Sequence, residues 1–82
     1  MLILKEVPDY TREENIKVDI YLSREDEYPV ESFIYNKLFK NQLTERLFRW
    51  YGHKGVFGID YDHERQWFVV KVALTEKVET GN

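Results

Sequence analysis

The longest candidate helix of the chain reads PVESFIYNKLFKNQLTERLFRWY, residues 29–51. Pro29 suits the first helical position, where its missing N–H costs nothing, and Glu31 places a negative charge in the first turn. Gly52 follows directly, and a glycine just past the last turn can adopt the left-handed conformation that ends a helix. These signals predict a helix over residues 30–51.

The apolar residues of this segment change sides halfway along. At about 100° per residue, each half of the segment forms its own apolar stripe, on roughly opposite sides of the helix. The first stripe contains Val30, Phe33, Ile34 and Leu38, and the second contains Phe39, Leu43, Leu47 and Trp50. Either the helix breaks near Asn41, or it is straight and lies between its own sheet and something else. We expect a break between Phe39 and Leu43, with both stripes on one core.

The composition indicates one small folded domain over residues 1–82. Of the 82 residues, 43% are hydrophobic and 16% are aromatic, which is enough for a modest core. The absence of cysteine excludes a disulfide framework and a catalytic thiol, and fits a reducing, cytoplasmic setting. The opening residues, MLILKEV, are too short and too soon charged for a signal peptide, and no apolar run approaches membrane-spanning length. We therefore expect no membrane partner.

Four segments have the pattern of β-strands: residues 2–7, 16–22, 56–62 and 66–74. Residues 16–22 alternate cleanly, and residues 66–74 are the most strand-like run. The side chains expected to face the core are Ile16, Val18, Ile20, Leu22, Phe57, Ile59, Tyr61, Phe68, Val70, Val72 and Leu74. The pattern is lost after residue 75, so residues 76–82 should fray.

These elements predict an α+β domain in the order strand, strand, helix, strand, strand. The first and fourth strands read as apolar runs, typical of central strands, whereas the second and third alternate as edge strands do. The predicted sheet order is therefore 2-1-4-3, with the central strands parallel and the helix crossing one face. This arrangement resembles the β-grasp layout of ubiquitin-like domains in element order alone; no motif of that family is present, so it implies no function. A sheet in simple hairpin order is the alternative.

For each candidate catalytic, cofactor or metal site in the sequence, a purely structural role explains the residues better than a functional one. Four polar residues near the second hairpin turn could offer ligands to a divalent metal: Asp60, Asp62, His63 and Glu64. Hairpin turns commonly collect such residues because they tolerate turn geometry. The segment Gly52–Gly55 follows a helix, whereas a phosphate loop precedes one. The paired carboxylates lie in charged loops, where no apolar cleft can separate their pKa values. We expect no enzyme, no metal and no cofactor.

The best functional hint is the face of the sheet that the helix leaves open. Trp67, Val69 and Tyr21 should lie there, with Ile3 and Val7 beside them. An apolar patch on an uncovered sheet is costly unless something covers it, and Trp and Tyr are enriched in protein interfaces. Partial cover by the chain's own tail, or an isolated exposed tryptophan, is the simpler alternative. The predicted partner-binding residues are Trp67, Val69, Tyr21, Lys71 and Lys17.

These observations favour a small protein-binding module, an adaptor or inhibitor, whose partner is another protein or a second copy of itself. The alternative is a sequence-limited nucleic-acid binder that stacks bases on the open face, using Trp67, Tyr21, Lys17 and Lys71. Fifteen acidic against twelve basic side chains, a net charge of −3, make nucleic acid the less favoured partner.

Overall fold

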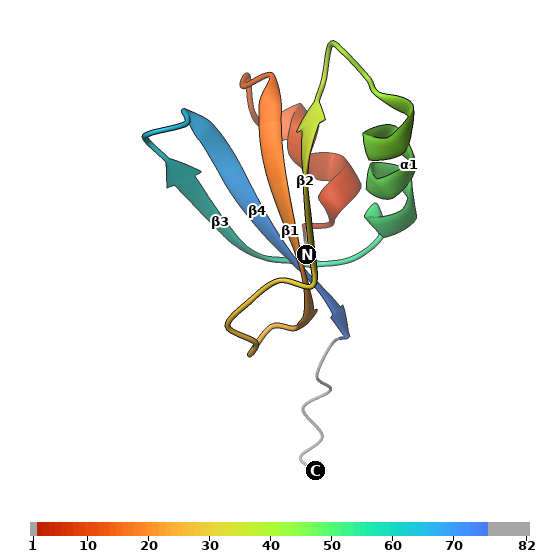
Figure 1. Ribbon diagram of the computed structural model, residues 1–82, viewed down its shortest axis with the longest axis vertical. Coiled ribbons are helices and arrows are strands. Elements are labelled where there is room, and N and C mark those ends of the chain that lie inside the picture. Colours follow the sequence, from red (N-terminus) through yellow and green to blue (C-terminus); the bar gives the residue numbers. More distant parts are fainter. Residues whose placement is uncertain (1, 76–82) are drawn as a thin grey trace.

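The four strands of the protein form one mixed sheet, in the order β2-β1-β4-β3 (Figure 1). The computed structural model describes residues 2–75. Its elements are the 3₁₀ helix η1 (Leu4–Tyr10), β1 (Asn15–Ser23), β2 (Glu31–Asn36), α1 (Gln42–Tyr51), β3 (Val56–Asp62) and β4 (Trp67–Thr75). β1 and β4 are parallel, and both hairpins are antiparallel. The α+β class, the ββαββ order and the β-grasp-like 2-1-4-3 layout are confirmed; the predicted fraying of residues 76–82 lies outside the described residues.

Two segments have a different secondary structure from the one predicted. Residues 2–7 were expected to be a strand, but Leu4–Tyr10 is a 3₁₀ helix. Leu4 and Val7 are both buried, and residues three apart share one side of a 3₁₀ turn, whereas a strand would place them on opposite faces. The Glu6 carboxylate secures this turn by accepting a hydrogen bond from the Ile3 N–H at 3.1 Å.

The second difference is in the predicted helix, whose first half is strand β2. Phe33 and Tyr35 are both buried. Residues two apart share a face in a strand, but they point about 200° apart in a helix. Glu31–Asn36 is therefore the strand that pairs with β1. Residues 16–22, predicted as the second strand, belong to β1, and the first half of the predicted helix supplies β2.

A helix boundary lies where the break was predicted, but strand β2 precedes it in place of a first half of the helix. Asn41 accounts for the start of α1. α1 begins at Gln42, and the Asn41 side-chain oxygen accepts hydrogen bonds from the N–H groups of Leu43 and Thr44, at 2.8 and 3.2 Å. The expectation that both apolar stripes reach one core is wrong. The exposed members of the two stripes are Val30, Ile34, Leu38, Phe39, Leu43 and Trp50.

The core lies between one face of the sheet and the two helices (Figure 1). The side chains with no exposed surface are Leu4, Ile16, Val18, Ile20, Val70 and Val72. α1 packs on β2 by stacking Phe48 on Tyr35 and Tyr51 on Phe33, with ring centroids 4.0 and 6.5 Å apart. Leu22, expected in the core, is 52% exposed. No helix within residues 2–75 is long and apolar enough to cross a membrane.

Two leucine substitutions test whether η1 closes the core. Leu4→Ala should lower the free energy of unfolding by about 2–5 kcal/mol, because it opens a cavity at a fully buried site. Leu22→Ala, at the exposed end of β1, should cost less than about 1 kcal/mol. Urea denaturation followed by circular dichroism measures both. Equal losses would contradict the placement of η1 over the core.

Candidate functional site

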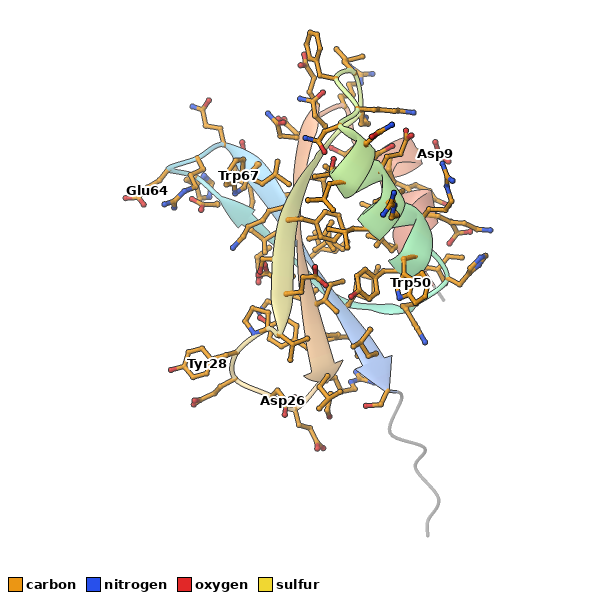
Figure 2. All side chains as sticks on the ribbon, turned by 45° about the vertical axis from the view of Figure 1, so that its right-hand side comes forward. Asp9, Asp26, Tyr28, Trp50, Glu64 and Trp67 are labelled. Carbon is orange, nitrogen blue, oxygen red and sulfur yellow. The ribbon has the colours of Figure 1, made fainter. Side chains whose placement is uncertain are left out.

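The five predicted partner-binding residues all lie on one face of the sheet, opposite η1 and α1. We call it the outer face. Its side chains alternate with those of the core, and Lys17 of β1 is paired with Val69 of β4. Figure 2 shows Trp67 on the side of the molecule away from α1. The residues of the outer face are Lys17, Asp19, Tyr21, Ser32, Ile34, Phe57, Asp60, Trp67, Val69, Lys71 and Ala73.

Tyr21 lies on β1, which is the neighbour of the strand that carries Trp67, but the two side chains are at opposite ends of the outer face. Residues 16–22 were expected to form an edge strand, separated from residues 66–74 by residues 2–7. They belong instead to β1, which pairs directly with β4 and sets Tyr21 beside Ala73. Ala73 is six positions from Trp67, roughly 20 Å along the strand. Val7, expected on this face, is buried in the core on the other side.

An ionic band crosses the middle of the outer face. The Asp19 carboxylate accepts a hydrogen bond from the Ser32 hydroxyl at 2.7 Å and pairs with the Lys17 ammonium at 3.3 Å. The Lys71 ammonium pairs with Asp60, also at 3.3 Å. The outer face therefore lacks the continuous apolar patch that was expected. It has an apolar region at each end, and the two ion pairs, Lys17–Asp19 and Lys71–Asp60, lie between them.

The Tyr21 end of the outer face is closed by the protein itself. Tyr21 is only 7% exposed and meets the ring of Phe57 edge to face, with centroids 5.4 Å apart. Phe57 was expected to face the core with Ile59 and Tyr61, but a register shift between Val56 and Gly58 turns it outward. Glycine within a strand often marks such a bulge, so Gly58 was the signal for it. Tyr21 and Phe57 hold each other in place and offer little surface to a partner.

The Trp67 end is open and contains an unpaired donor. Trp67 is half-buried, and its indole N–H is buried without a hydrogen-bond partner among the described residues. An orphaned buried donor of this kind costs about 1–3 kcal/mol. Ile34 and Val69 flank Lys17 in the row beside it, and Ile34 is 40% exposed. These apolar side chains form a small patch around the stem of Lys17.

The turn before Trp67 is held by its own polar residues. The Asp62 carboxylate accepts hydrogen bonds from the N–H groups of Arg65 and Glu64, at 3.2 and 3.0 Å, and these bonds with the Arg65 guanidinium lower the pKa of Asp62. Gln66 closes the turn with φ at 60°, in the left-handed region. Within residues 2–75, no three His, Asp or Glu side chains come together as metal ligands.

A further hollow lies away from the outer face, between η1 and α1. It has a volume of about 400 Å³, and its lining includes Lys5, Arg49, His53 and Glu45 around the stacked rings of Tyr35 and Phe48. Arg49 lies 3.9 Å from Glu45, so its charge is partly compensated. The rim carries both signs of charge and selects no clear class of ligand.

No family model, curated relative or solved structure matches this chain. The function is therefore argued from the geometry of the surface.

Two aspartates test the ionic band. Asp19→Ala should cost about 1–3 kcal/mol of stability, because it removes a charge-assisted hydrogen bond and an ion pair that a buried carboxylate makes. Asp60→Ala removes an ion pair of the same length whose carboxylate is 65% exposed, and should cost no more than about 1 kcal/mol. Thermal and urea denaturation measure the stability of both variants. A larger loss of stability from Asp60→Ala than from Asp19→Ala would contradict the role given to Asp19 in the ionic band.

Proposed function

We propose that the protein is a small non-enzymatic binding module, an adaptor or inhibitor, that contacts another protein through the Trp67 end of the outer face. The contact residues are Trp67, Val69 and Ile34, with Lys17 and Lys71 at the rim. The observation that supports this proposal is the half-buried Trp67, which lies with Val69 on a face that no helix within residues 2–75 covers. Because the chain has no cysteine, we place it in the cytoplasm.

A protein partner suits this patch for two physical reasons. A buried aromatic side chain at the centre of an interface can be worth about 2 kcal/mol or more, and tryptophan is enriched among such anchors. The lysine stems can cover apolar surface while their charged ends stay paired at the rim.

The ion pairs weigh against nucleic acid as the partner. Lys17 and Lys71, the two lysines of the outer face, each lie 3.3 Å from a carboxylate. A phosphate would have to displace Asp19 or Asp60 from them, against a net charge of −3. Any affinity for single-stranded DNA should accordingly be weak.

The two tryptophans of the chain provide a matched test, because they lie on different sides of the molecule (Figure 2). Trp67→Ala should weaken partner binding at least about tenfold, the equivalent of about 1.4 kcal/mol. Trp50→Ala, on α1, should leave the affinity of a partner other than a second copy of the chain unchanged. Wild type and both variants serve as baits in the native cell extract, and the retained protein is then purified and titrated by calorimetry. A partner other than a second copy that binds Trp67→Ala as tightly as wild type would contradict the proposal.

Phe68→Ala supplies the stability control for this experiment. Phe68 faces the other side of β4, where it borders an apolar hollow of about 90 Å³ and meets the ring of Tyr61. Its truncation should cost about 2–4 kcal/mol of stability, because it enlarges this hollow. Trp67→Ala should change the melting temperature less than Phe68→Ala does. The opposite order would mean that Trp67 is part of the core.

A further inference from the structure

The free edge of β2 has backbone groups that no other strand uses. β2 lies at the end of the sheet, and the Lys37 N–H donates to the Glu14 carbonyl at 2.9 Å. In an antiparallel pair, alternate residues bond to the partner strand, so the N–H and C=O of Phe33 and Tyr35 point toward β1. Those of Ser32 and Ile34 point outward. β2 can therefore accept another strand.

The other edge of the sheet is protected, and β2 is not. β3 has a register shift between Val56 and Gly58, carries Asp60 and Asp62, and is met at its start by the Leu2 carbonyl, which accepts from Val56 at 2.9 Å. Bulges, charges and covered edges are the devices that prevent strand addition. Between Ser32 and Asn36, β2 has no charge, proline or bulge. A further strand would thus add at β2.

An apolar stripe on α1 lies beside this edge. Leu43, Leu47 and Trp50 follow one another at i, i+4 and i+7, next to the side of α1 that packs on β2 through Tyr51. Leu47 is half-buried, whereas Leu43 and Trp50 are 62% and 76% exposed. Figure 2 shows β2 and α1 side by side, with Trp50 on the outward surface of the helix.

The exposed apolar area here is larger than a small monomer usually leaves open. Phe39, in the β2–α1 connection, and Trp50 are each more than three-quarters exposed, and side chains of this size present roughly 150 Å² each in that state. Leu38 and Leu43 add to this area. The total exceeds the few hundred Å² typical of a monomer's patches and approaches the roughly 600–800 Å² that each partner contributes to a modest dimer.

We infer that this surface is the interface of a homodimer, in which β2 pairs antiparallel with β2 of a second copy across a two-fold axis. The inference concerns the edge of β2 and the stripe on α1, which share only Ile34 with the Trp67 end, and it does not rest on the proposed function. An extended peptide would fill the strand edge but leave the helix stripe exposed. A second copy has the same free strand edge and the same apolar helix stripe, separated by the same distance. Pairing of the two β2 edges therefore makes the two sheets continuous and packs the two stripes together.

The charges of β2 are complementary in this arrangement. Pairing Ile34 with Ile34 keeps the core faces of both sheets on one side and sets Glu31 of each copy opposite Lys37 of the other. The Glu31 carboxylate accepts a hydrogen bond from the Tyr51 hydroxyl at 2.6 Å, which raises the pKa of Tyr51, and the Lys37 ammonium donates to the carbonyls of Pro8 and Thr11. Within residues 2–75 neither has an ion-pair partner, and the second copy supplies one.

Solution mass and hydrogen exchange test the dimer on the unaltered protein. Sedimentation equilibrium over micromolar to millimolar concentrations should show a mass that doubles. The amide protons of Ser32 and Ile34 should exchange rapidly in dilute protein and become protected as the dimer forms. A monomer at every concentration, or a dimer in which these two amides stay unprotected, would overturn the inference.

Three variants then locate the interface. Ile34→Pro removes an N–H that points away from β1, so the monomer should keep its sheet while strand addition is blocked. Trp50→Lys places a charge in the helix stripe. Each should weaken dimerisation about tenfold or more, whereas Gln42→Lys, about 100° around α1 from Leu43 and outside the stripe, should change it less than about threefold. Circular dichroism verifies folding, and a dimer insensitive to both Ile34→Pro and Trp50→Lys would refute this interface.

Discussion

The parallel pairing of β1 with β4 holds the two halves of the molecule together. Each half is a hairpin, and an isolated two-stranded hairpin is marginal in water. The pairing sets Ile16, Val18 and Ile20 beside Phe68, Val70 and Val72 and aligns their side chains on the core face. η1 and α1 cover that face, and the same register determines which residues meet on the outer face. Core and candidate site are thus two consequences of one strand register.

Two asparagines divide the segment between the hairpin turn and α1 in a way that its hydrophobic pattern does not reveal. The Asn36 side-chain oxygen accepts from the N–H groups of Leu38 and Phe39, at 2.8 and 2.7 Å, and this turn ends β2. Asn41 then caps α1. The reversal of the apolar stripe marked the region where α1 begins, but it could not show that the first half of the segment is a strand. Helical and alternating patterns are hard to separate over six residues, and pairing with β1 decides the outcome.

The candidate site was partly predictable for a similar reason. Alternation along β1 and β4 was enough to place Lys17, Tyr21, Trp67, Val69 and Lys71 on one face. Their surroundings depend on cross-strand neighbours, which a period-two pattern does not specify. The pairing of Lys71 with Asp60 requires the β3–β4 register, and the closure of Tyr21 by Phe57 requires the bulge before Gly58. The free edge of β2 could likewise not be predicted from a pattern that favours a helix over residues 30–51.

Cysteine cross-linking tests the central pairing directly, because the natural chain has no cysteine to interfere. Lys17, Val69 and Asp60 lie in one row of the outer face, on β1, β4 and β3. Adjacent strands are about 4.8 Å apart, within disulfide range, whereas strands two apart are separated by about 10 Å. The double variant Lys17→Cys with Val69→Cys should form an intramolecular disulfide on mild oxidation, and Lys17→Cys with Asp60→Cys should stay reduced. Mass spectrometry of the folded proteins with and without reductant gives the result; failure of the first pair to cross-link, or equal cross-linking of the second, would contradict this arrangement.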